Sequence, residues 1–207
     1  MTTLNDLVQA VLDFKNVEIG PQELLEEVRS FDPDGLDREL RTPLQRAAEQ
    51  GNLELVKILL ENGAKVNRYD DYGRNALHLA KNEDVMEELL KHAALKDINE
   101  WDHYEKTPLH YAVSSGDTEL MELLFEKGAC PSAVQEDGGQ TPLQLAAMAG
   151  KIDAIEFLLR KGASKRFRDN HDALAWHWAR QFLIRTPLKR IPGGKEYWED
   201  VVMPQLV

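Results

Sequence analysis

Six histidines and one cysteine are the residues of this sequence best suited to metal binding or nucleophilic catalysis. No two histidines stand four residues apart, the spacing that places two metal ligands on one helix face. The single cysteine, Cys130, excludes an internal disulfide and a zinc site built on cysteines, and we expect it to be a small half-buried side chain. No carboxylate stands in an apolar segment that would tune it as an acid or base. We therefore expect no catalytic residue, no metal and no cofactor.

Length and composition are those of a globular protein with one domain, or with one domain and an appendage. The helices or strands of that domain must position any functional site. The chain has 207 residues, and 43% are hydrophobic. It carries 25 Lys and Arg against 36 Asp and Glu, a net charge of −11, which disfavours nucleic acid as a partner of the whole surface. No apolar run reaches the ~18 residues of a membrane span, and residues 1–14 lack the basic start of a signal peptide. These features favour a cytoplasmic protein.

A repeat of about 33 residues runs through the chain. A three-residue motif returns at intervals of 33, 32 and 34 residues, and a Leu-Leu pair followed by Gly-Ala or Ala-Ala returns in phase with it. The motif occurs as Thr42-Pro43-Leu44, Asn75-Ala76-Leu77, Thr107-Pro108-Leu109 and Thr141-Pro142-Leu143. Threonine is a good N-cap and proline fits the first helical turn, so each motif predicts a helix start. Glycines after the apolar stripes predict helix ends.

This pattern resembles the ankyrin repeat family, whose units begin T-P-L-H-x-A, as Thr107 to Ala112 do here. The resemblance implies an all-α solenoid of helix-turn-helix units with projecting finger loops, and a non-catalytic role in protein–protein interaction. We assign four repeats to residues 36–170, an N-terminal capping helix pair to 1–35 and a degenerate capping repeat to 171–207, with a final helix over 196–202. His78 and His110 fall on the family's structural histidine position.

Two departures from the pattern predict local differences. The second repeat is shorter by about one helical turn near Lys81-Asn82-Glu83, so we expect a distorted unit there. Leu40 and Glu105 stand where the family prefers glycine, so we expect their finger tips to differ in shape.

The resemblance implies that partner contacts come from the finger loops, and two adjacent fingers are rich in aromatic residues. Tyrosine and tryptophan dominate interface hot spots, and a loop beside water has no folding need for them, although Tyr69 and Trp101 could instead pack on a neighbouring finger. We therefore predict that this patch anchors a protein partner. The acidic charge of the chain would suit a basic partner. The predicted contact residues are Arg38, Arg41, Tyr69, Asp71, Tyr72, Arg74, Trp101, His103, Tyr104 and Lys106.

A second candidate surface is basic. Residues 160–195 hold ten Lys and Arg against Asp169 and Asp172, interleaved with Trp176, Trp178 and Phe182. Such a segment could bind an acidic protein, nucleic acid or an anionic membrane surface, or could be a solvated cap over a core of aromatics. Its candidate residues are Lys165, Arg166, Arg168, Arg180 and Arg185.

The leading hypothesis is a stand-alone, stoichiometric binder or inhibitor of one protein, monomeric when free and without a small-molecule substrate. The alternatives are a binder of nucleic acid or anionic surfaces through residues 160–195, and an effector delivered into a host cell. The resemblance does not name the partner.

Overall fold

The computed structural model describes residues 41–94, 96–134, 139–186 and 194–207. Every regular element in these ranges is helical, which confirms the predicted all-α class. By its contacts the chain divides into two compact units, residues 1–104 and 105–207, and each is described by itself. The predicted helix pair of residues 1–35, Arg38 and Leu40 lie outside the described ranges, and the proposed domain boundaries stay a prediction.

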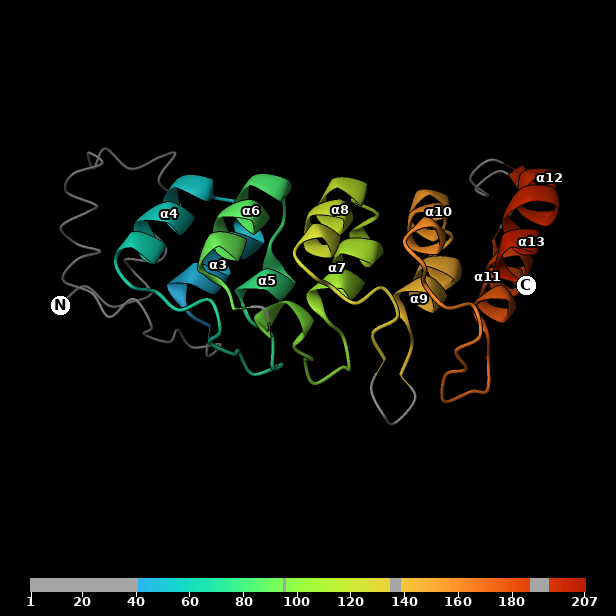
Figure 1. Ribbon diagram of the computed structural model, residues 1–207, viewed down its shortest axis with the longest axis horizontal. Helices are drawn as coiled ribbons and strands as arrows, with labels where there is room; N and C mark the ends of the chain where they lie inside the picture. Colours follow the sequence, from blue (N-terminus) through green and yellow to red (C-terminus); the bar gives the residue numbers. More distant parts are fainter. Residues whose placement is uncertain (1–40, 95, 135–138, 187–193) are drawn as a thin grey trace. The chain divides into compact units, whose positions relative to one another are not determined.

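The described part of the first unit, from residue 41 on, contains two helix pairs followed by loops (Figure 1). Helix α3 (Pro43–Gln50) packs on α4 (Leu53–Glu61) and on α5 (Ala76–Leu79). Helix α6 (Glu83–His92) follows α5, packs on α4, and is followed by the short 3-10 helix η1 (Asp97–Asn99). Each pair therefore consists of a first helix beside its finger loop and a second helix behind it.

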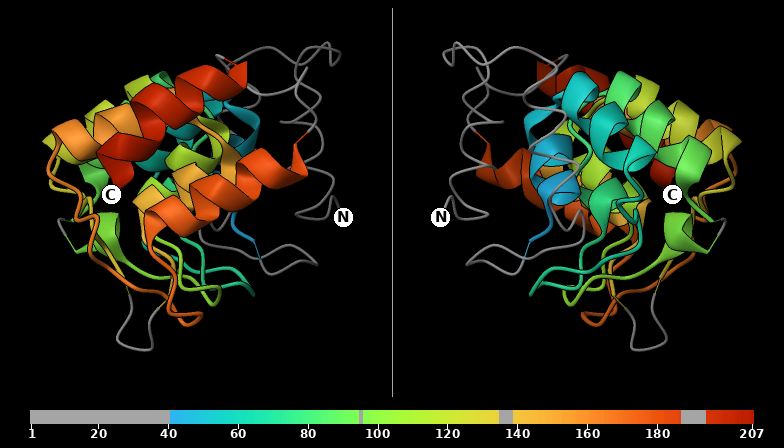
Figure 2. Two further views of the ribbon diagram at one scale, coloured as in Figure 1. Left: turned by 90° about the vertical axis from the view of Figure 1, so that its right-hand side faces the viewer. Right: turned by 90° about the vertical axis from the view of Figure 1, so that its left-hand side faces the viewer.

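The second unit repeats this arrangement. It contains α7 (Pro108–Ser115), α8 (Thr118–Glu126), α9 (Pro142–Ala149), α10 (Ile152–Arg160) and α11 (Ala175–Arg185). A continuous helical segment then runs through α12 (Gly194–Tyr197), a π-helical turn η3 (Trp198–Val202) and α13 (Met203–Leu206), which includes the predicted helix over 196–202. In this unit α9 lies between α7 and α11, with the finger loops projecting from the first helices (Figure 2).

The helix starts follow from the repeated motif. Thr42 and Thr141 cap α3 and α9 by accepting a hydrogen bond from the N–H of the residue three positions on, and proline fills the first turn of each helix. The first helices end at Gly51, Gly116 and Gly150, each in the left-handed conformation that glycine adopts without strain. Fully buried alanines on these helices let neighbouring helices approach closely.

A polar side chain at the third helical position ties each first helix to the next finger loop. The Gln45 amide donates to the backbone oxygens of Arg68 and Arg74, and the Gln144 amide donates likewise to Phe167 and Ala173. His78 and His110 occupy this position and bond through Nε2 to the backbone oxygens of Glu100 and Gln140. Both histidines are buried, which confirms the structural role implied by the resemblance.

The second repeat is distorted where the sequence predicted it. Helix α5 has 4 residues, whereas α3, α7 and α9 have 8 each. The missing turn is replaced by contacts with the preceding repeat, because the Asn82 amide donates to the Gly51 oxygen and the Lys81 N–H donates to the Ala48 oxygen. The shortened unit is thus held by these hydrogen bonds in addition to the packing of α5 on α3 and of α6 on α4.

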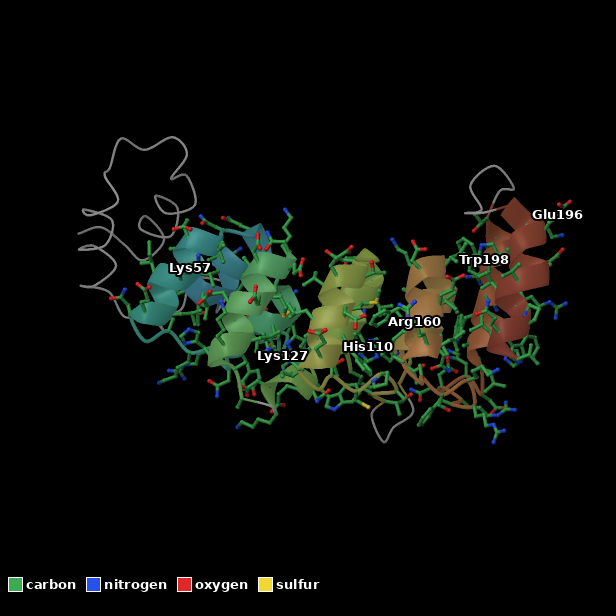
Figure 3. All side chains as sticks on the ribbon, turned by 45° about the horizontal axis from the view of Figure 1, so that its top comes forward. Lys57, His110, Lys127, Arg160, Glu196 and Trp198 are labelled. Atoms are coloured by element: carbon green, nitrogen blue, oxygen red, sulfur yellow. The ribbon has the colours of Figure 1, made fainter. Side chains whose placement is uncertain are left out.

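Aromatic packing closes the C-terminal end of the second unit. Trp198 is fully buried, and its ring lies 5.1 Å from that of Phe182 on α11. Figure 3 shows Trp198 among the helices, whereas Glu196 points away from them. The ring of Phe182 also covers Gly150, where a Cβ atom would lie 2.2 Å from Cζ. Glycine at position 150 is therefore required by this contact as well as by its backbone.

Candidate protein-binding site on the finger loops

A buried aspartate shapes each described finger tip. Asp70, Asp102 and Asp169 are buried, and Oδ1 of each accepts a hydrogen bond from the N–H two residues later. These bonds fix the turn as an Asx-type turn. The side chains that follow at the tips are Tyr72, Tyr104 and His171. The repeat thus presents an aromatic ring at the same position of each of these three fingers.

In the first unit the tip rings form a cluster. Tyr72 and Tyr104 stack with centroids 5.9 Å apart and planes 24° apart, although the two residues are 44% and 60% exposed. Tyr69, at the base of the same finger as Tyr72, is 46% exposed. We call Tyr69, Tyr72 and Tyr104 the tyrosine cluster. Three large rings left in water are typical of an interaction surface rather than of a fold.

Arg74 orders the cluster from one side. Its guanidinium donates through Nε and Nη2 to Oδ2 of Asp70, at 2.9 and 2.7 Å, and lies 4.9 Å from the Tyr72 ring centroid. The result is a column of Arg74, Tyr72 and Tyr104. Since the ion pair holds the guanidinium and the turn holds Tyr72, the rings are pre-positioned for a ligand.

Arg41, a predicted partner contact, forms ion pairs within the first unit. Its Nη1 donates to Oε2 of Glu49 at 2.7 Å, and its Nε lies 3.7 Å from Oδ2 of Asp70. The side chain is largely buried in these ion pairs. Arg41 therefore supports the carboxylate that holds Tyr72, and its contact with a partner stays a prediction.

The other described residues predicted in the first unit lie on the same two fingers as the tyrosine cluster. Asp71 is exposed beside Tyr72, and Trp101 is half-buried. The His103 N–H donates to the Tyr72 oxygen at 2.8 Å, which ties the two fingers together. Burial raises the pKa of Tyr69, and the carboxylates of Glu100 and Asp97 raise it further. The carboxylates of Glu100 and Asp97 thus place negative charge near this ring, in addition to the effect of burial.

In the second unit, Lys106 lies at the base of its finger, with Nζ 5.9 Å from the Tyr111 ring centroid. The neighbouring Glu105 has a φ of 60°, close to the 74° of Gly73 at the equivalent position. The expectation that glutamate would change the tip there is wrong, because Glu105 adopts the strained left-handed backbone instead.

The predicted basic segment separates into paired and unpaired cations. Lys161 forms an ion pair with Glu122 and lies over the rings of Phe125 and Phe157, and Arg160 lies over Phe157 (Figure 3 labels Arg160). Arg168 pairs with the exposed Asp172. Four cations make no ion pair within the described ranges: Lys165, Arg166, Arg180 and Arg185.

Sequence reasoning missed one contact that shapes the last described finger, that of Trp178. Its indole Nε1 donates to Oδ2 of Asp169 at 2.6 Å, and its ring meets His171 edge-on at 5.9 Å. Burial raises the pKa of Asp169, but the hydrogen bonds from the Ala173 N–H, this indole and the His171 N–H outweigh it, so the pKa lies below its usual value. No spacing in the sequence signals this bond, which joins a residue of α11 to the finger before it.

The described residues hold no cluster of three or more His, Cys, Asp or Glu side chains that could bind a metal ion. Cys130 is exposed, which corrects the expectation of a half-buried filler. What the site offers is therefore aromatic surface, fixed charges and hydrogen-bonding groups on preformed turns, which suit recognition of another macromolecule.

Comparison with known proteins identifies the family. The model of ankyrin repeats in three copies matches residues 6–100 and 69–135, and the model of the single ankyrin repeat matches residues 138–170. The chain belongs to the ankyrin repeat family. The solved ankyrin repeat domain of Bcl-3, a member of the IkappaB protein family, superimposes with a TM-score of 0.73 at 28% identity, covering 86% of this chain and 81% of that one.

Curated relatives of this ankyrin protein are much longer. A putative ankyrin repeat protein of Rickettsia felis is 33% identical over 140 residues, which cover 65% of this chain and 35% of the relative. The human transient receptor potential cation channel subfamily A member 1 is 34% identical over 93 residues, which cover 44% of this chain and 8% of the channel. The chain thus spans about a third or less of these relatives. No described helix of this chain has the length and apolar character to cross a membrane.

Proposed function

We propose that this ankyrin chain is a non-catalytic protein-binding module that holds one protein partner through the tyrosine cluster. The observation that carries the proposal is the stacked pair of Tyr72 and Tyr104, held in place by buried aspartates while both rings face water. Binding would cover this apolar area, and truncation of an interface tyrosine of this kind costs about 1–4 kcal/mol of binding free energy.

The mode of action that fits a rigid recognition surface is occupancy. A partner bound to the fingers either has part of its own surface blocked or is brought close to another protein. We therefore propose a stoichiometric binder of the inhibitor or scaffold type. The predicted cytoplasmic location belongs to this proposal and rests on the low cysteine content.

The test is affinity capture from a lysate of the source organism, read by mass spectrometry. The variant is Tyr72→Ala/Tyr104→Ala, because both residues are exposed and their loss should leave the fold intact. The control Ile184→Ala/Val201→Ala removes two exposed apolar side chains of the second unit. Circular dichroism first establishes that all three chains are folded.

We expect one dominant protein to be captured by the wild type and the control and to be lost with the tyrosine variant. Capture of the same proteins by all three chains would show that the tyrosine cluster is not the binding site.

A second candidate function is supported by the unpaired cations Lys165, Arg166, Arg180 and Arg185. These exposed or half-exposed charges could bind an anionic ligand such as nucleic acid. Binding of that kind weakens steeply with salt. For duplex DNA, each phosphate contact adds about −0.9 to the slope of log K against the logarithm of the salt concentration. Two results would exclude this function. One is that the chain does not bind duplex DNA. The other is that its affinity for duplex DNA changes neither with salt nor in the Arg166→Glu/Arg180→Glu variant.

A further inference from the structure

Tyr104 is the end member of the column of Arg74, Tyr72 and Tyr104. Arg74 lies over Tyr72, and Tyr72 stacks on Tyr104. Within the described ranges Tyr104 has no other ring contact and no cation over it, and it is the most exposed ring of the cluster. The face of an aromatic ring carries the negative part of its quadrupole and attracts cations.

The surroundings of the column favour positive charge. The exposed Asp71 adjoins Tyr72. Burial raises the pKa of the Tyr69 hydroxyl most, and the nearby carboxylate of Glu100 raises it further. The charge of Arg74 is offset by its two hydrogen bonds with Asp70. The whole first unit, residues 1–104, carries 12 Lys and Arg against 22 Asp and Glu, a net charge of −10.

We propose that Tyr104 binds an arginine or lysine side chain of the protein partner on the ring face that Tyr72 leaves free, and that the partner segment is basic. This inference rests on the proposed function, since it names the chemistry of the partner held by the tyrosine cluster. The geometry has a counterpart within the site, because Arg74 already lies on Tyr72 in the same way, with its guanidinium 4.9 Å from the ring centroid.

An acidic segment suits this site less well. It would approach a unit of net charge −10 with the exposed Asp71 beside Tyr72, and the guanidinium of Arg74 is already bonded to Asp70. A nucleic acid could stack bases on the rings, but it would bring phosphates into the same field. A cationic side chain is attracted both by the ring face of Tyr104 and by the negative charge of the surrounding unit.

The experiment selects ligands from random sequences, so the partner need not be identified first. A library of random dodecapeptides displayed on phage is panned on the full chain, and the pool is depleted on the Tyr104→Ala variant. The remaining peptides are sequenced, and the most enriched one is synthesised with a fluorophore. Its affinity is measured by anisotropy for wild type, Tyr104→Phe and Tyr104→Leu, and again after each of its Arg or Lys residues is replaced by Gln.

We expect the depleted pool to be rich in Arg or Lys. Tyr104→Phe should bind within about twofold of wild type because it keeps the ring face, and Tyr104→Leu, which keeps apolar volume without that face, should bind about 3- to 30-fold more weakly. Replacing one cation of the peptide should weaken wild-type binding by a similar factor and should have little further effect on Tyr104→Leu.

Two results would overturn the inference while leaving the proposed function intact. One is a pool that depends on the tyrosine cluster but has no excess of cations, and the other is equal binding to Tyr104→Leu and wild type. A single-stranded oligonucleotide that binds more tightly than any selected peptide, and loses affinity in Tyr104→Leu, would also replace the basic segment as the ligand. If depletion on Tyr104→Ala removes every peptide that the wild type selects, or if no peptide is selected at all, both proposals are contradicted.

Discussion

The contact between Gly150 and Phe182 allows a stability prediction with an internal control. Gly150 has a φ of 67°, and a Cβ atom there would lie 2.2, 2.4 and 2.6 Å from three atoms of the Phe182 ring. That ring cannot swing away freely, because its other neighbour is the buried Trp198. Gly162 is also left-handed, with a φ of 86°, but a Cβ atom there would meet nothing within 4 Å.

The two alanine variants therefore separate backbone strain from steric overlap. Gly162→Ala should cost only the left-handed backbone, about 1–2 kcal/mol. Gly150→Ala should cost this amount and a further ~1–3 kcal/mol for overpacking against Phe182. We expect Gly150→Ala to be the less stable by the second amount.

Urea unfolding followed by tryptophan fluorescence measures the difference. Three of the four tryptophans, at positions 176, 178 and 198, lie in the last helices of the second unit, so the signal reports on this region even if the terminal repeat unfolds before the rest. Equal free energies of unfolding for Gly150→Ala and Gly162→Ala would refute the packing of Phe182 on Gly150.

Three further predictions follow from single side chains. Glu105→Gly should stabilise the protein by about 0.5–1 kcal/mol in thermal unfolding, because the glutamate holds a φ of 60°; an unchanged or lower melting temperature would contradict this. Trp178→Phe removes a hydrogen bond to Asp169 and should cost about 1.5–3 kcal/mol at pH 7. The pKa of Asp169 is lowered in the folded state, so its hydrogen bond stabilises the fold at pH values above the unfolded pKa. The stability lost in Trp178→Phe should therefore shrink as acid protonates the carboxyl. A stability loss that does not change with pH would argue against the ionised acceptor. Glu100→Gln should lower the pKa of Tyr69 partway toward its usual value, with burial maintaining the rest, as measured by NMR titration of labelled tyrosine; an unchanged pKa would show that Glu100 does not act on the ring.

The repeated motif predicted the fold well because it encodes local chemistry. Threonine caps, prolines in first turns and glycines at helix ends determine where each helix begins and stops, so the four described starts could be placed from sequence alone. The shortening of α5 could be predicted for the same reason, since a missing turn changes the spacing of the motif.

Contacts between residues far apart in the sequence could not be predicted in this way. The stacking of Tyr72 on Tyr104, 32 positions apart, depends on two turns whose exact shape is fixed by buried aspartates. The pairing of Arg41 with Glu49 likewise depends on how α3 meets its finger, and motif spacing carries no information about side-chain direction. Glu105 shows a second limit, because the tertiary structure imposes a left-handed backbone that the residue itself disfavours.

The central claim is that the tyrosine cluster holds a protein partner, and calorimetric titration of the captured partner tests it most directly. The partner is titrated into wild type, Tyr72→Ala/Tyr104→Ala and the control Lys57→Ala, a change at a half-exposed lysine of α4 that Figure 3 labels. The structure predicts binding at least about tenfold weaker for the tyrosine variant and unchanged for the control, since each exposed ring contributes as an interface anchor. Dissociation constants within twofold of each other for all three chains would contradict the claim.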